Sequence, residues 1–265
     1  MENLAKYFIA FSIYSFFGYI AEVIYVYIIT KKITNRGFLY GPVVPIYGFG
    51  AILIIGVLSP IYNLFTWYSP ILVFILGFLL TSALEYFASF VMEAAFNMRL
   101  WDYSEHKFNI NGRVCLLNST LFGALVILVM YVLNPYIVMK LVNLISDHSI
   151  IGLFIISTLI FISFSVDFTF SLIKHIEIAK VMHYLRQASL SIQNGVEIIK
   201  EKTGSVKDGL ANKISSIKNV IENKKYEKLI QDTYMHYPSF KVKLDKRRMS
   251  IQEFVEQIKK KVKGE

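Results

Sequence analysis

Five apolar stretches, each long enough to cross a lipid bilayer as a helix, constrain the fold more than any other feature of the sequence. A helix needs about 20 mostly apolar residues to span the hydrocarbon, and it satisfies its backbone hydrogen bonds internally. The sequence therefore predicts an all-α bundle of five membrane spans. The first stretch is too long for a signal-peptide core and lacks a small-residue cleavage site before Lys31, so we expect it to stay. The expected spans are residues 7–29, 43–65, 70–92, 114–133 and 150–173.

The net positive charge lies in the last part of the chain. Residues 174–265 hold 20 Lys and Arg against 11 Asp and Glu, whereas residues 1–173 hold 8 of each kind. We therefore expect two domains, a transmembrane domain at 1–173 and a basic tail at 174–265. Apolar residues of the tail recur at helical spacing beside lysines, as at Val206, Leu210 and Ile214, which predicts amphipathic helices.

A basic helical tail next to a membrane favours contact with the anionic inner leaflet, where each Lys or Arg gains roughly 1 kcal/mol. Self-association and a protein partner are the alternatives. Nucleic acid is not expected as a partner, because the tail has no aromatic interleaving, recognisable fold motif or cysteine–histidine spacing. The single cysteine, Cys115, excludes an internal disulfide and is expected to pack as a small apolar residue. We expect neither a metal site nor a cofactor.

The charges of the connections predict the orientation of the spans. The second connection carries no charge and the fourth has only Lys140 and Asp147, whereas the first and third are basic. We therefore expect the amino terminus outside the cell, and the first and third connections and the tail in the cytoplasm. The basic residues of these two connections are Lys31, Lys32, Arg36, Arg99, Lys107 and Arg113.

The fourth connection, residues 134–149, is itself apolar at helical spacing. Its stripe of Ile137, Leu141, Leu144 and Ile145 predicts a short helix lying in the outer membrane interface. A helix that binds a partner is the alternative.

Three carboxylates lie inside predicted spans: Glu22 in the first, Glu85 in the third and Asp167 in the fifth. An acidic side chain at the membrane centre costs about 2.5 kcal/mol or more, so it normally faces the bundle interior or water. At 1.5 Å per residue, all three lie roughly 10–12 Å inside the cytoplasmic boundary. Small or hydroxyl residues accompany each acid at four-residue steps, which lets helices approach closely. We expect the three acids to meet in one layer.

Other polar groups are expected around this acidic layer. Asn118 lies within about two turns of the start of the fourth span, and Tyr47 lies near the start of the second. We place both in a polar pocket with the three acids. Arg36, Arg99 and Arg113 lie on the same side of the membrane, and we expect them at the pocket mouth or as partners of the acids.

Residues 35–51, NRGFLYGPVVPIYGFGA, lead from the first connection into the second span. Pro42 and Pro45 are expected in the first turn of the helix, where a missing N–H costs little. Gly48 and Gly50 lower the helix tendency and allow close backbone approach. The stretch either lines a binding site or packs tightly as a kinked helix, and the residues alone favour neither.

Three blocks of sequence in this order resemble a known family: residues 35–51, WDYS at 101–104 and NINGRVCLLNSTLFG at 109–123. They resemble the bacterial membrane proteins of the ABC-transporter type IV family, also called CmpB-type permeases. The resemblance covers all five spans and extends to the closing YPSFKVKLDKRRMSIQEFVEQIKKK. It implies a multi-pass protein of the bacterial inner membrane and suggests transport. The matching positions include Gly37, Gly41, Pro42, Pro45, Gly48, Trp101, Asp102, Tyr103, Asn111 and Gly112, with Arg36, Tyr47, Arg113 and Asn118.

Three classes of function follow from these features. A permease component would bind an ion or a small polar solute among the buried acids, and with only five spans it would need a homo-oligomer or a partner. The chain has no GxxxxGK[ST] motif, so in an ABC system a separate ATPase subunit would dock on it. A scaffold or regulatory protein would act through the tail. A membrane enzyme is least supported, because there is no HExxH, nucleophile elbow or paired metal-ligand spacing.

Overall fold

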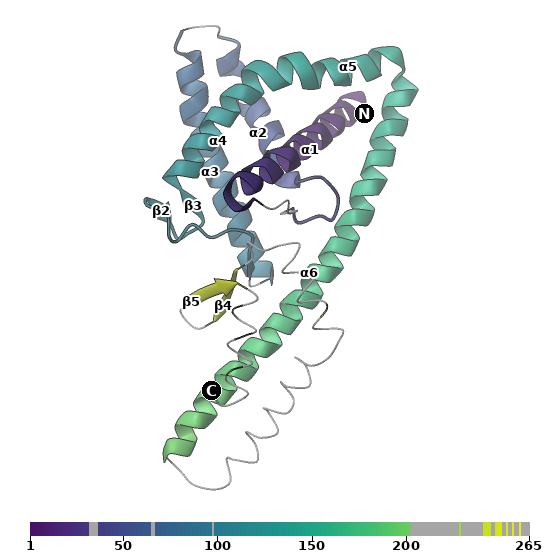
Figure 1. Ribbon diagram of the computed structural model, residues 1–265. Coiled ribbons are helices and arrows are strands. Elements are labelled where there is room, and N and C mark those ends of the chain that lie inside the picture. The colour runs from purple at the N-terminus through teal and green to yellow at the C-terminus, as the bar shows by residue number, and fades with distance from the viewer. Residues whose placement is uncertain are drawn as a thin grey trace. The chain divides into compact units, whose positions relative to one another are not determined.

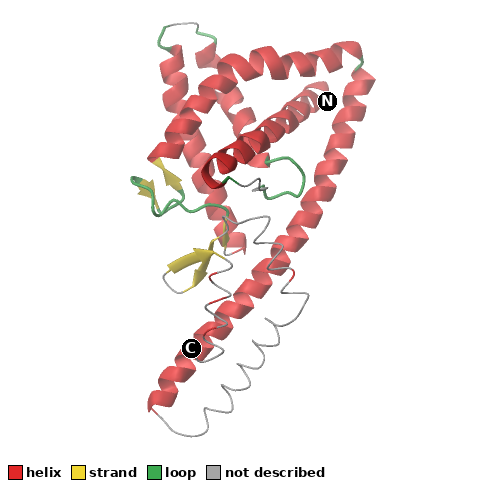
Figure 2. Cartoon of the chain, viewed as in Figure 1, coloured by secondary structure: helices red, strands yellow, loops and turns green. Residues whose placement is uncertain are grey.

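Helices make up most of the described chain (Figure 1, Figure 2). The computed structural model describes the backbone of residues 1–31, 37–64, 67–96 and 98–201, and of 228, 241–244, 247–250, 253, 256 and 260. The chain divides into two compact structural units. The first unit comprises Met1–Val91 and Asp102–Ser171, and the second comprises Met92–Trp101 and Leu172–Glu265. The helices are α1 (Glu2–Thr30), α2 (Pro45–Tyr62), α3 (Ser69–Phe96), α4 (Leu116–Leu128), the π-helix η1 (Val129–Val138), α5 (Met139–His148) and α6 (Ile150–Glu201).

Five helices within the described residues are long and apolar enough to cross a membrane, which confirms the number of predicted spans and their helical character. The prediction of an all-α protein is not fully met, because the described residues also include short strands. The five helices match the five predicted stretches in order, with shifted ends. These helical segments are Glu2–Ile28, Pro45–Tyr62, Ser69–Phe96, Leu116–His148 and Ile150–His183.

The fourth of these helices runs further than expected. The sequence predicts a stop near residue 133, because Asn134 and Pro135 follow, but α4 continues through η1 into α5 (Figure 1). Pro135 lies inside η1, where the change to π-helical geometry carries the chain past a residue that has no N–H to donate. Residues 134–149 are therefore helical, as expected, but they extend the fourth helix rather than form a separate short one.

The apolar stripe predicted for the membrane interface lies mostly on the protein surface of α5, and another residue faces the helix bundle. Val142 is fully buried, whereas Leu141 and Leu144 are 44% and 68% exposed. Val142 packs in the cluster between α1 and α5, so the apolar stripe and the buried face of α5 are different sides of the helix. Whether the exposed stripe lies in the membrane interface stays a prediction.

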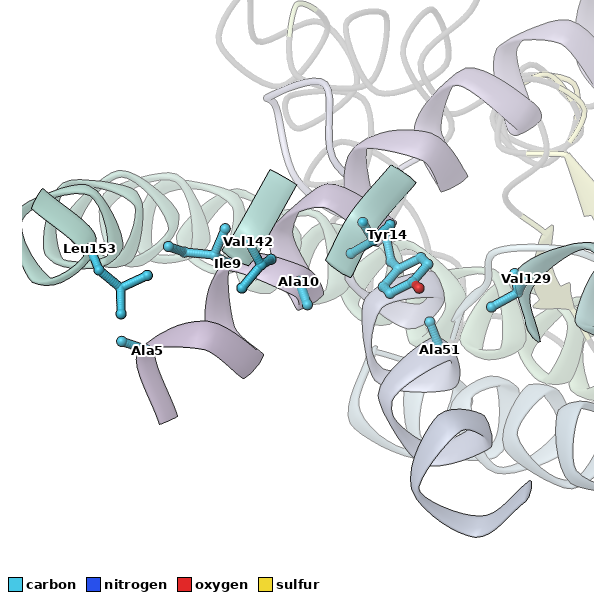
Figure 3. Close-up of a cluster of buried hydrophobic side chains, with 9 residues drawn as sticks. Ala5, Ile9, Ala10, Tyr14, Ala51, Val129, Val142 and Leu153 are labelled. Atoms are coloured by element: carbon cyan, nitrogen blue, oxygen red, sulfur yellow. The ribbon is translucent and has the colours of Figure 1, made fainter. Parts of the chain in front are cut away.

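A buried apolar cluster holds α1, α2, η1, α5 and the start of α6 together within the first unit. Small side chains of α1, Ala5 and Ala10, let the neighbouring helices approach, and Tyr14 donates a hydrogen bond to Asn134 Oδ1 at 3.0 Å. Figure 3 shows the side chains of this cluster spread in a row, from Leu153 and Ala5 at one end to Val129 at the other. The cluster comprises Ala5, Ile9, Ala10, Tyr14, Ala51, Val129, Val138, Val142 and Leu153.

The helix α2 begins at Pro45, as the first-turn rule for proline predicts. Pro42 was expected in the same turn, but it lies in the irregular segment before the helix, because Val44 is extended and forms the N-cap. Gly48 then packs against α1: a Cβ atom there would collide with Ser15 and lie 2.6 Å from the ring of Phe11. Part of the glycine-rich stretch therefore serves helix packing.

A small hairpin precedes α4 in the first unit. Strands β2 (Asn109–Ile110) and β3 (Val114–Cys115) pair antiparallel. Asn111 and Gly112 between them have φ of 54° and 66°, and Arg113 N–H donates to the Ile110 carbonyl at 3.0 Å. Two successive positive φ angles are typical of a type I′ turn, for which Asn-Gly is the preferred sequence.

The second unit contains a three-stranded sheet, which the expectation of a purely helical tail did not include. Strand β4 (Lys241–Leu244) lies between β1 (Met98–Arg99) and β5 (Arg247–Ser250), and both pairings are antiparallel. The tail therefore joins the connection that follows α3 through backbone pairing. The amphipathic stripe from Val206 lies outside the described residues, whereas α6 extends unbroken to Glu201.

Candidate functional site

Glu22, on α1, accepts a hydrogen bond from Tyr47, on α2. The Tyr47 hydroxyl donates to Glu22 Oε1 at 2.9 Å. The tyrosine reaches this position because it packs over Gly18, one helical turn before Glu22, where a Cβ atom would collide with the ring. A close contact between α1 and α2 that only glycine permits therefore fixes this pair.

Glu85, on α3, is the most buried of the three predicted acids, with 6% of its surface exposed. Its Oε1 accepts a hydrogen bond from the Tyr103 hydroxyl at 3.0 Å. Asn118, on α4, lies near enough to the Tyr103 side chain to lower the pKa of Tyr103 against the larger effect of burial. Glu85 Oε2 is buried and has no hydrogen-bond partner among the described residues, and the same is true of the Ser89 hydroxyl one turn along α3.

The loop that carries Tyr103 is held by its own hydrogen bonds. Tyr103 N–H donates to the Gly112 carbonyl at 2.8 Å, and Gly112 N–H donates to Asn109 Oδ1 at 2.9 Å. Asp102 accepts from the Ser104 N–H at 3.1 Å. Gly112 has a positive φ, and a Cβ there would lie 2.6 Å from Asp102 Oδ1, so glycine is required. These motif residues position Tyr103 over Glu85.

The hydroxyl of Tyr103 remains protonated at neutral pH. Burial raises the pKa of Tyr103 well above its ordinary value, and the neighbouring Glu85 raises it further. Tyr103 is therefore a donor to Glu85 and does not act as a base.

The two glutamate–tyrosine pairs form one group. Glu22 and Glu85 are near enough to interact electrostatically, and Tyr47 interacts in the same way with Glu85 and Tyr103. Neither glutamate forms an ion pair with any residue that the structure describes. We call Glu22, Tyr47, Glu85, Tyr103 and Asn118 the glutamate–tyrosine cluster. It contains four of the five residues predicted for the polar pocket.

Asp167, on α6, binds the loop before α2. Its Oδ1 accepts from the Tyr40 N–H at 2.9 Å and its Oδ2 from the Gly41 N–H at 2.8 Å, while the Ser171 hydroxyl donates to Oδ1 at 3.1 Å. A Cβ atom on Gly41 would lie 2.8 Å from Oδ2, so a side chain at this position would force the Asp167 carboxylate to shift. No described contact joins Asp167 to the other two acids. Of the three carboxylates expected in one layer, Glu22 and Glu85 therefore belong to one cluster, whereas Asp167 binds a loop.

The three predicted arginines have different surroundings. Arg36 lies outside the described residues. Arg99 is 2% exposed, and its Nε lies 2.6 Å from Glu93 Oε2 in an ion pair within the second unit. Neither Arg99 nor Arg113 forms an ion pair with a glutamate of the cluster.

Arg113 and Asn111 attach the hairpin to α3. The Arg113 guanidinium lies 5.2 Å from the ring centre of Tyr86 and 5.3 Å from that of Phe90. Asn111 Nδ2 donates to the Tyr86 hydroxyl at 3.1 Å. Contacts between a cation and aromatic faces stabilise such a placement. These two motif residues support the loop that delivers Tyr103.

Sequence reasoning misses Tyr103 as a partner of Glu85 and includes it only among the family-motif positions. The loop between α3 and α4 has no periodicity from which its path could be read. The signal that was present is the dipeptide Asn111-Gly112, which predicts a tight turn and a chain that folds back toward α3.

A comparison with family models identifies the family to which the chain belongs. The model of the family described as "Putative ABC-transporter type IV" matches residues 9–172, more than half of the 265-residue chain. The matched region contains all five residues of the glutamate–tyrosine cluster and Asp167. No curated protein and no solved structure matches the chain significantly. The chain is therefore a multi-pass membrane protein that belongs to the ABC-transporter type IV family.

Proposed function

We propose that this protein is the membrane permease component of an ABC-type system and moves an ion or a small polar solute past the glutamate–tyrosine cluster. One observation carries the proposal. Glu22 and Glu85 lie on different spans, are held by tyrosine hydroxyls, and form no ion pair with any described residue. A purely structural network would neutralise such acids with cations, because an unpaired buried charge is costly.

The proposed setting is the bacterial inner membrane, with the amino terminus outside and the basic tail in the cytoplasm. The charge difference between the connections supports this orientation. In that position the tail would contact the anionic inner leaflet.

The ATP-hydrolysing step would belong to a separate ATPase subunit, since family membership suggests an ABC system and the chain has no P-loop motif. Five spans are few for a complete path, so we propose that the protein works as a homo-oligomer or beside a second membrane subunit. Crosslinking in native membranes followed by affinity purification and mass spectrometry tests this. An ATPase subunit should be recovered in stoichiometric amount.

Transport itself is tested in proteoliposomes that contain the purified assembly. Uptake of radioactive rubidium, sodium and a pool of labelled amino acids is measured, with ATP inside or outside. At least one tracer should enter above the level of empty liposomes, and Glu85→Gln should reduce its uptake at least tenfold. Glu105→Gln removes an exposed carboxylate and should leave uptake unchanged. Equal uptake by the wild type and Glu85→Gln would reject a transport role for the cluster.

A membrane scaffold acting through the tail is the second candidate. The observation that favours it is the pairing of β4 with β1, which joins the tail to the connection after α3. Val242→Pro removes a backbone donor from the central strand β4, whereas Val242→Thr keeps it. If the tail is the working part, the proline variant should lose crosslinked partners and the threonine variant should keep them. Retention of all partners by the proline variant would contradict the scaffold.

A further inference from the structure

We propose that Glu85, with Glu22 beside it, binds a proton, so that the ion handled by the glutamate–tyrosine cluster is H⁺. The proton site itself follows from the geometry of the cluster. That this proton is carried across the membrane rests on the proposed permease function.

The first step of the argument is the surroundings of the Glu85 carboxyl. Glu85 is 6% exposed and lies on an apolar span. No described cation pairs with it, and an unpaired carboxylate that is removed from water tends to become neutral by taking up a proton. The buried Glu85 carboxylate would need a positive charge to neutralise it, and no described residue supplies one.

The second step is the pattern of hydrogen bonds. Tyr103 donates to Oε1 of Glu85, but Oε2 has no partner among the described residues. The Ser89 hydroxyl lies one turn away on the same face of α3, is 1% exposed, and also lacks a hydrogen bond. Glu85 therefore has a buried carboxyl oxygen to which no described residue donates, and protonation removes the charge that this oxygen would otherwise share.

The third step concerns the groups that face Glu85. These are Tyr103 from the loop, Glu22 from α1 and, through electrostatic interaction, Tyr47 from α2. None of them is a cation. A negative charge on Glu22 makes a second negative charge on Glu85 more costly, which favours the protonated form of Glu85.

A proton fits better than a metal ion. Among the described residues there is no group of three or more His, Cys, Asp or Glu side chains placed to hold a metal. Calcium usually takes six to eight oxygen ligands, including several carboxylates. The cluster offers two carboxylates whose remaining neighbours are neutral hydroxyls and an amide.

The test uses the full-length protein in lipid nanodiscs and measures infrared absorption of protonated carboxyl groups as the pH is raised. The wild type should show a protonated-carboxyl band at neutral pH that disappears at higher pH. The band should be absent from Glu85→Gln and retained in Glu105→Gln. No such band in the wild type, or the same band in Glu85→Gln, would overturn the proposal.

A second measurement needs no variant, so it remains decisive if Glu85→Gln does not fold. A membrane-permeant carbodiimide reacts with protonated carboxyl groups, and mass spectrometry locates the adduct. Glu85 should be labelled at neutral pH, and its labelling should fall by roughly tenfold per pH unit once the proton is lost. Protection of Glu85 by sodium chloride, compared with choline chloride, would assign the site to a metal cation and overturn the proposal.

Proton movement is measured separately with a pH-sensitive dye inside proteoliposomes. Labelling of Glu85 together with proton flux supports both the site and its use. Labelling without flux would leave the proton site standing and reject the permease role, so the two failures are distinguishable.

Discussion

At the scale of single residues, two tyrosines hold two glutamates in a site where charged carboxylates would otherwise be poorly solvated. Tyr47 reaches Glu22 from a helix, whereas Tyr103 reaches Glu85 from a loop that hydrogen bonds keep in one conformation. A buried carboxyl oxygen that loses its hydrogen-bond donor costs about 1–3 kcal/mol of stability. The tyrosines therefore stabilise the protein as well as arrange the acids.

Tyr103→Phe tests this at the more buried carboxyl. The variant keeps the ring but leaves the buried Oε1 of Glu85 without its donor, so the free energy of unfolding should fall by about 1–3 kcal/mol. Thermal unfolding in detergent measures the change. Tyr68→Phe removes an exposed hydroxyl as the matched control and should melt with the wild type. Equal melting temperatures for both variants would show that the Tyr103 bond does not stabilise the fold.

At the scale of helices and strands, the apolar stretches predict where the membrane helices lie because span length and hydropathy depend on the segment alone. Their ends and contacts depend on partners that are distant in sequence. The extension of the fourth helix past Pro135 requires η1, and the two-residue strands β2 and β3 are too short to show an alternating pattern.

The candidate functional site, like the fold, could be predicted from the sequence only in part. The acidic positions could be predicted, because a carboxylate inside an apolar run stands out. Their partners could not, because Tyr103 and the amides of Tyr40 and Gly41 come from irregular segments. For the glycine-rich stretch 35–51, the sequence allowed either tight helix packing or a role in the site, and the structure shows residues of both kinds. Gly48 packs the helices, while Tyr47 beside it binds Glu22.

Two glycines of α2 give a matched test of the contact between α1 and α2. Gly48→Ala places a Cβ atom against Ser15 and the ring of Phe11, and such overpacking should cost about 1–3 kcal/mol of stability. Gly56→Ala adds the same atom where nothing lies within 4 Å, so stability should stay or rise by up to about 1 kcal/mol. Unfolding in a detergent series measures both. Equal effects would contradict a close contact at Gly48.

At the scale of the whole molecule, the net charge lies in the last part of the sequence, and the helix α6 begins before this part and ends within it. The last 92 residues, 174–265, carry all of the net charge of +9, yet α6 extends from Ile150 to Glu201 as a single helix of 52 residues. At 1.5 Å per residue this helix is roughly 78 Å long, more than twice the thickness of a hydrocarbon core. Much of it must therefore lie outside the hydrocarbon.

The orientation of the molecule can be tested with single cysteines in a Cys115→Ala background, because Cys115 is the only natural cysteine. Trp67 is 84% exposed in the second connection, and Glu105 is exposed in the third. A membrane-impermeant maleimide should label Trp67→Cys in intact cells and Glu105→Cys only after permeabilisation, since the basic connection is expected inside. The reverse pattern would invert the proposed topology.

The hydrogen bonds that Asp167 accepts from the backbone before α2 have a mechanical consequence. Rotation of α6 about its axis at Asp167 would pull the carboxylate away from the two amides of Tyr40 and Gly41 and release the segment that leads to Tyr47. The position of the hydroxyl that donates to Glu22 would thus depend on a carboxylate with which it has no described contact.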